Sequence, residues 1–185
     1  IVDLKDENVS INGIKNLSGE EDFNQVFFDD VFIPDDRVVG QPGNGWAQVI
    51  SELGYERSGP ERFLSAFRVL VEYSKELSSD ASDDQLSVLG RLVAHLITLR
   101  RMSISVAGML ENGETPITEA ALIKDVGNAY ERLVPEVVRL FQTRNPSARF
   151  LETLNQCVLH APSFTLRGGT REILKGVIAR GLGLR

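Results

Sequence analysis

The residues with the clearest capacity for ligand chemistry lie near the C-terminal end, where Gly168 and Gly169 precede Thr170. Two adjacent glycines let the backbone approach a ligand closely. The start of a helix offers unpaired N–H groups to an anion or to a polarised carbonyl oxygen. Thr170 stands where a helix N-cap is expected, so an ordinary turn followed by a capped helix is the alternative. The residue types leave both interpretations open.

Other chemistry-bearing residue types exclude several classes of site. Cys157 is the single cysteine of the sequence, so it forms no disulfide framework or cysteine-rich metal site within the chain. His95 and His160 lie far apart and lack the spacing of zinc ligands. A net charge of -6 argues against a nucleic-acid-binding surface. The sequence shows no apolar run long enough for a membrane span and no signal peptide. We expect a reducing, cytoplasmic setting.

The first 40 or so residues are predicted to form β structure. Val9 to Ile11 alternates in polarity, and Asn12-Gly13 is a dipeptide typical of tight turns. Residues 23 to 33 hold aromatic and branched side chains, interrupted by Asp29-Asp30 and ended by Pro34. Strands this short are not stable as an isolated sheet. We therefore expect them to complete a sheet whose other strands lie upstream in a longer protein.

The rest of the 185-residue sequence has helical periodicity. Pro60, after Ser58 and Gly59, is predicted to kink or split the first helix, and Pro135 lies inside the third. Short connections indicate antiparallel neighbours. We predict a mainly α fold, with the last strands of a β domain at residues 1–42 and a four-helix-bundle-type domain at 43–185. The expected helices span about 46–77, 86–110, 117–143, 148–160 and 171 onward.

Four motifs, in this order and spacing, resemble the C-terminal half of the acyl-CoA dehydrogenase family. They are the aromatic segment Phe23–Pro34, Gly45-Trp46, Tyr55-Glu56-Arg57, and the Gly-Gly-Thr-Arg-Glu-Ile segment from Gly168. The resemblance implies an FAD-dependent oxidoreductase that removes an α and a β hydrogen from an acyl-CoA thioester. It also implies an electron-transfer acceptor and a homodimer or homotetramer.

This chemistry requires a carboxylate that takes the α-proton as general base. In many members of the family it is a Glu directly before the Gly-Thr of the last motif, but Gly168 stands there in this sequence. Isovaleryl- and long-chain-type enzymes place the Glu on the first helix of the C-terminal domain, directly before an Arg. Glu56 matches that position and is the expected base. Alternatively it is a surface residue paired with Arg57 or Arg62, and Glu61 is a weaker candidate.

The resemblance also implies roles for the residues around these motifs. Gly168 is expected to offer its backbone N–H to the thioester oxygen, a role that needs no side chain. The expected substrate-binding residues are Tyr55, Arg57, Gly168 and Gly169, and the expected flavin contacts are Thr170, Arg171 and Glu172. For Thr170 and Glu172, helix capping is the alternative, and for Arg57 an ordinary ion pair.

Two segments that contact the flavin in the family are missing from this sequence. Ser74–Asp80 stands where an Arg-x-x-Phe-Gly segment is expected, and Gln156–Pro162 stands in place of a Gln-x-x-Gly-Gly segment. A second hypothesis is therefore a non-catalytic partner subunit that supplies structure and part of a composite flavin site in a heteromeric pair. We expect the chain alone to be inactive and to bind little or no flavin.

Overall fold

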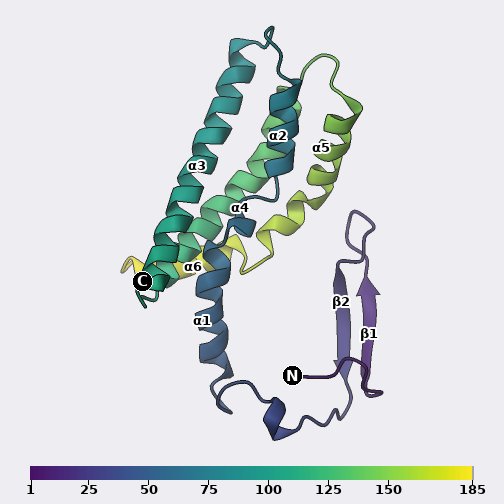
Figure 1. Cartoon of the computed structure of the whole chain (residues 1–185), viewed down its shortest axis with the longest axis vertical. Coiled ribbons are helices and arrows are strands. Elements are labelled where there is room, and N and C mark those ends of the chain that lie inside the picture. Colours follow the sequence, from purple (N-terminus) through teal and green to yellow (C-terminus); the bar gives the residue numbers. More distant parts are fainter. Residues whose placement is uncertain (185) are drawn as a thin grey trace. The chain divides into compact units, whose positions relative to one another are not determined.

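The computed structural model describes residues 1–184 and divides into two compact units, Ile1–Ile50 and the chain from Ser51 onward. The described residues are mainly helical, with two short strands near the N-terminus (Figure 1). This confirms the predicted fold class. The helix α1, Gly45–Ser58, continues across the division between the units. The domain boundary predicted after residue 42 stays a prediction.

The first unit contains an antiparallel pair of strands, β1 (Val9–Ile14) and β2 (Phe23–Phe28), followed by the 3₁₀ turn η1 (Asp35–Arg37). The turn predicted at Asn12-Gly13 is wrong, because both residues lie inside β1 opposite Gln25 and Asn24. The register places Ile11 opposite Val26, and the ladder of backbone hydrogen bonds continues through the dipeptide. The connection between the strands lies at residues 15–22 instead.

Turn chemistry in that connection comes from two other residues. The side-chain oxygen of Asn16 accepts hydrogen bonds from the backbone N–H groups of Ser18 and Glu20, and Gly19 has a φ of 86°. A positive φ suits glycine, which has no Cβ to clash. At the far end β2 stops at Phe28, just before the predicted interruption at Asp29-Asp30, and residues 31–33, also predicted as β, form no strand.

The second unit is a bundle of helices. Helix α1 ends at Ser58, and the 3₁₀ turn η2 begins at Pro60 after the single residue Gly59. This break confirms the split predicted at Pro60. Ser82 begins α3 with a capping box to Gln85, and Ser147 caps α5 through the Phe150 N–H. The bounds are η2 Pro60–Arg62, α2 Phe67–Glu76, α3 Asp83–Glu111, α4 Ile117–Leu140, α5 Ala148–His160, η3 Ala161–Thr165 and α6 Arg171–Gly181.

Helix α4 is the centre of the bundle. It contacts α2, α3, α5 and α6, and also the short turns η2 and η3 (Figure 1). Pro135 is buried within α4, which runs on through it to Leu140. The core around α4 is apolar and almost fully buried, and includes Tyr73, Leu99, Ile123, Tyr130, Val134 and Phe150. A central helix packed this way fixes the elements at its N-terminal half, where the candidate site lies.

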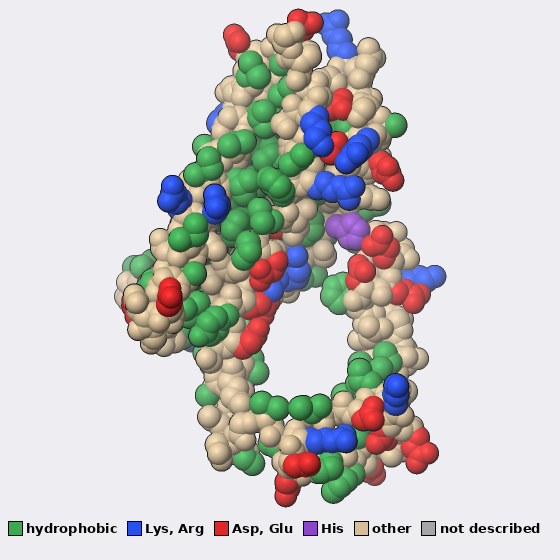
Figure 2. All heavy atoms as spheres, viewed as in Figure 1, with side chains coloured by type: hydrophobic (Ala, Val, Ile, Leu, Met, Phe, Trp, Pro, Cys, Tyr) green, Lys and Arg blue, Asp and Glu red, His purple; other side chains and the backbone are tan. Residues whose placement is uncertain are grey.

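Hydrophobic side chains also gather on the outer surface over α2 and α3 (Figure 2). A hollow of about 600 Å³ between these helices and η2 is lined mostly by apolar side chains. Among the helices described up to residue 184, none is both long and apolar enough to cross a membrane.

Candidate functional site

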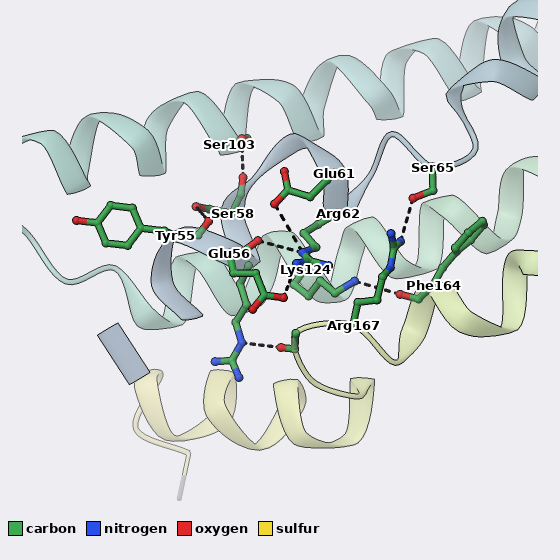
Figure 3. Close-up of polar contacts among 12 residues, drawn as sticks. Tyr55, Glu56, Ser58, Glu61, Arg62, Ser65, Ser103, Lys124, Phe164 and Arg167 are labelled. Carbon is green, nitrogen blue, oxygen red and sulfur yellow. Dashed lines mark hydrogen bonds and ion pairs between the residues drawn. The ribbon is translucent and has the colours of Figure 1, made fainter. Parts of the chain in front are cut away.

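The candidate site forms where the end of α1 meets the Gly-Gly turn before α6. The Nε of Arg57, on α1, donates a 2.8 Å hydrogen bond to the backbone oxygen of Gly168. The end of α1 is anchored on its other side, since the Ser103 hydroxyl of α3 donates to the Ser58 carbonyl at 2.6 Å (Figure 3). The Arg57–Gly168 bond brings together two segments that are 111 positions apart in the sequence.

Glu56 lies directly beside Gly168. A Cβ atom added at Gly168 would stand 2.9 Å from Oε1 of Glu56, so the Glu56 carboxylate faces the space that a side chain at 168 would enter. The Glu56 side chain is 24% exposed. The two sequence positions at which a general base is expected therefore lie next to each other in the fold, and one of them carries the carboxylate.

Arg62 contacts Glu56 twice. Its Nη2 forms an ion pair with Oε1 of Glu56, and its Nε donates a 3.1 Å hydrogen bond to the Glu56 backbone oxygen (Figure 3). The alternative expected for Glu56, an ion pair with Arg62, is thus present. It does not exclude a role as base, because Arg62 binds Oε1 and the carboxylate has a second oxygen, Oε2.

Glu61, the weaker candidate for the base, also lies beside Arg62. The helix ends at Ser58, and η2 turns the chain back, so Oε1 of Glu61 lies 3.9 Å from Nε of Arg62. The Glu61 side chain is 55% exposed, more than twice the value for Glu56. Of the two carboxylates, Glu56 is the more enclosed.

The Gly-Gly turn presents unpaired backbone donors. Gly168 and Gly169 have φ values of 66° and 113°, a conformation that favours glycine. Within residues 1–184 neither N–H has a recorded hydrogen-bond acceptor. Thr170 occupies the N-cap position of α6, but its side chain makes no cap hydrogen bond. The Thr170 side chain therefore caps no first-turn N–H group of α6.

Two polar residues of α6 have partners of their own. Glu172 has a lowered pKa, mainly because of its own backbone N–H and secondly because of the Thr170 hydroxyl. Arg171 donates to both carboxylate oxygens of Asp125 on α4, at 2.7 and 3.4 Å, and this contact raises the pKa of Arg171. Arg171 thus fastens α6 to α4.

The other residues expected at the site differ in their environment. Arg57 is buried, and burial lowers the pKa of its guanidinium while the charge of Glu56 opposes that shift. Tyr55 is 59% exposed, and its ring points away from Glu56 (Figure 3). The structure therefore brings Glu56, Arg57, Gly168 and Gly169 together and leaves Tyr55 apart from them.

Sequence reasoning missed a buried polar cluster behind the site. Lys124 is fully buried, and its Nζ donates to the side-chain oxygen of Asn128 and, at 3.1 Å, to the Phe164 carbonyl. Burial lowers the pKa of Lys124 to about 8, against the opposing charge of Glu131. Lys124, Asn128 and Glu131 are spaced i, i+4 and i+7, so they share one helical face. Three polar residues on the core face of α4 are a signal that the sequence does contain.

Glu131 joins this cluster to the Gly-Gly turn. Its Oε1 accepts from the Ser65 N–H at 2.8 Å, and its Oε2 accepts from Nη2 of Arg167 at 3.0 Å. The Arg167 guanidinium also lies over the ring of Phe164, 5.3 Å from its centroid. Arg167 precedes Gly168 directly, so these buried contacts hold the turn against α4.

Comparison with known proteins gives relatives over the whole chain. No family profile matches it. The acyl-CoA dehydrogenase IpdE1 of Mycobacterium tuberculosis is 30% identical over 199 residues, which cover 100% of this chain and 50% of that protein. The acyl-CoA dehydrogenase FadE34 of the same organism is 27% identical over 187 residues, covering 98% of this chain and 26% of that protein. The chain thus spans half or less of these relatives.

Solved structures share the fold. The structure named Tcur3481-Tcur3483 steroid ACAD superposes with a TM-score of 0.80 at 21% identity, over 100% of this chain and 51% of that one. At this identity the similarity establishes the fold alone. The arrangement of strands and helices is therefore one already known in larger proteins.

Proposed function

We infer that this chain belongs to the acyl-CoA dehydrogenase family, as its curated relatives do, and we propose that it carries the base and the oxyanion donors of such an enzyme. The reaction is the α,β-dehydrogenation of an acyl-CoA thioester by an FAD-dependent oxidoreductase. The observation that supports this most directly is the Glu56 carboxylate facing Gly168, beside a turn whose N–H groups are unpaired.

In the proposed reaction Glu56 takes the α-proton of the substrate. The electrons of the broken C–H bond pass into the thioester, whose oxygen gains negative charge as the enolate develops. The N–H groups of Gly168 and Gly169 stabilise that charge, since preorganised backbone donors act strongly in an enclosed site. Arg57 keeps the turn in place through its bond to the Gly168 oxygen.

The residues at the start of α6 fit one contact with a flavin. The backbone N–H of Thr170, which has no acceptor among the described residues, offers a hydrogen-bond donor to the polar edge of a ring, and Gly169 leaves the approach open. Arg171 is held by Asp125, so we assign it the positioning of α6 against α4. Glu172 remains a proposed contact. When bound, the flavin supplies the acceptor for the β-hydride.

A partner subunit without catalysis is the second candidate function. It is favoured by the two missing flavin segments and by the paired name of one structural neighbour, Tcur3481-Tcur3483. In that case Gly168 and the start of α6 would complete a flavin site shared with another chain. A complete protein that purifies with flavin, without any partner, would contradict this alternative.

Substitution of Glu56 by Gln in the complete protein tests the main proposal. We expect the rate of anaerobic flavin reduction by straight-chain, branched and steroid-derived acyl-CoA thioesters to fall by about 100-fold or more, the contribution of a general base. Glu61→Gln is the matched comparison, since Glu61 also lies beside Arg62 but is more exposed. Turnover that survives Glu56→Gln would rule out Glu56 as the base.

A further inference from the structure

We propose that Arg62 is a positioning residue that aims the Glu56 carboxylate; this rests on the proposed function, in which Glu56 is the base. Arg62 belongs to η2, and it binds both the side chain and the backbone oxygen of the same glutamate. Because one guanidinium binds both the backbone and the carboxylate of Glu56, these bonds restrict the conformers that the Glu56 side chain can adopt. An ordinary surface ion pair provides no such constraint.

The contact leaves one carboxylate oxygen free. Arg62 contacts Oε1, and Oε1 is also the atom that faces Gly168. In the part of the chain that the structure describes, no side chain or backbone donor is recorded for Oε2 of Glu56. With one oxygen held by a cation, the other is available to accept a proton in a fixed direction.

Arg62 is itself held firmly by α4. Its side chain is 11% exposed, and a Cβ added at Gly127 of α4 would lie 2.5 Å from its backbone oxygen. The helix therefore packs directly against the backbone of η2, as only a glycine allows. This rigid support is what a positioning residue requires, because a shift of about 1 Å in a catalytic group can cost 100-fold in rate.

A purely structural ion pair, which fastens η2 to α1, is the competing explanation. Both explanations predict some loss of stability when Arg62 is replaced. Only the positioning role predicts that the effect acts through Glu56. The experiment therefore uses the complete protein with its flavin, and measures kcat and KM with the acyl-CoA thioester that reduces the wild-type flavin fastest.

Four variants separate the two explanations. We expect Arg62→Gln to lower kcat by about 10- to 100-fold with KM within about twofold. Arg62→Lys keeps the charge but lacks the planar guanidinium, so kcat should recover in part. Arg68→Gln, at an exposed arginine of α2, is the matched control and should match wild type. In Glu56→Gln/Arg62→Gln, kcat should equal that of Glu56→Gln alone.

The outcomes are distinct. Wild-type kcat in both Arg62 variants would overturn the positioning role while leaving Glu56 as base. An equal loss from Arg62→Gln in the wild-type and Glu56→Gln backgrounds would also overturn it, since Arg62 would then act independently of Glu56. Should Arg62→Gln lose its flavin or its helical circular dichroism, kcat of Arg62→Lys decides, and a wild-type value there would overturn the positioning role. Full activity of Glu56→Gln would reject the proposed base itself, and the proposal for Arg62 with it.

Discussion

At the scale of residues, the site depends on a complementary pair, a glutamate on α1 and a glycine before α6. Gly168 lacks the side chain that would collide with Glu56, whose Oε1 would lie 2.9 Å from a Cβ there. Gly168 also adopts a positive φ of 66°, which costs a non-glycine residue about 1–2 kcal/mol. The glycine therefore serves the backbone conformation and leaves room for the carboxylate at the same time.

Lys124 gives a residue-scale prediction about pH. Its pKa of about 8 in the folded chain lies below the ordinary value of 10.5, because burial disfavours the ammonium form. Between these values the unfolded chain binds more protons than the folded one, so stability contributed by Lys124 increases as pH rises. Relative to Lys124→Met, the free energy of unfolding of the wild-type chain should increase by about 2 kcal/mol from pH 7 to pH 10.

Urea denaturation of both chains at several pH values measures this difference. Lys124→Met removes the titrating group and retains much of its volume, so other groups that titrate in the same range cancel in the comparison. Parallel pH profiles for the two chains would show that Lys124 keeps its proton throughout.

At the scale of elements, the break between α1 and η2 creates the geometry around Glu56. The last carbonyl groups of a helix have no partner within it. Pro60 ends the helical run, and the chain turns back so that Arg62 donates to the Glu56 carbonyl. A helix that continued through residue 60 would pair that carbonyl internally and point Arg62 elsewhere. The same turn brings η2 against α4 at Gly127.

Gly127 gives the element-scale prediction. In Gly127→Ala the added Cβ would lie 2.5 Å from the Arg62 backbone oxygen and 3.3 Å from Cβ of Phe63, so η2 or α4 must shift. We expect a loss of about 1–3 kcal/mol, typical of overpacking. Gly90→Ala on α3 is the control, because its Cβ would meet nothing within 4 Å. That change should stabilise the chain by about 0.5–1 kcal/mol through helix propensity.

Thermal and urea unfolding of the purified chain compare the two variants. If both alanines stabilised the chain, the close packing of α4 on η2 would not determine the effect of Gly127→Ala on stability. The opposite signs are expected because one glycine lies under a neighbouring backbone and the other faces open space.

At the scale of the whole molecule, the chain has two compact units and the fold of a part of larger proteins. Its length is about half that of IpdE1 and about a quarter of that of FadE34. In the strand pair, Val26, Phe27 and Phe28 are exposed, so side chains on both faces of β2 lack cover within that unit. The second unit has its own apolar core around α4.

A whole-molecule prediction concerns flavin. We expect residues 1–185, expressed alone and incubated with free FAD, to show no flavin absorption after desalting. The physical reason is that the start of α6 offers a single contact region, and two segments that bind flavin in the family are missing from this sequence. A yellow chain after desalting would show that these residues suffice to bind the cofactor.

Local sequence signals accounted for much of the fold. Pro60 separated two helical elements as predicted, and the apolar periodicity indicated most of the helices within a few residues. Such features act between near neighbours in the chain, so they can be identified from the local sequence alone. The exception, Asn12-Gly13, failed because pairing with β2 outweighed the turn preference of two residues.

The sequence by itself also determined the family resemblance, the absence of a carboxylate at residue 168 and the candidacy of Glu56. Only the tertiary structure decided that Glu56 faces Gly168, that Arg62 binds Glu56, and that Lys124 is buried behind them. Those contacts join α1, η2, α4 and the turn before α6, which are distant in the chain. Their geometry depends on how helices pack, and packing is set by the whole core rather than by any short segment.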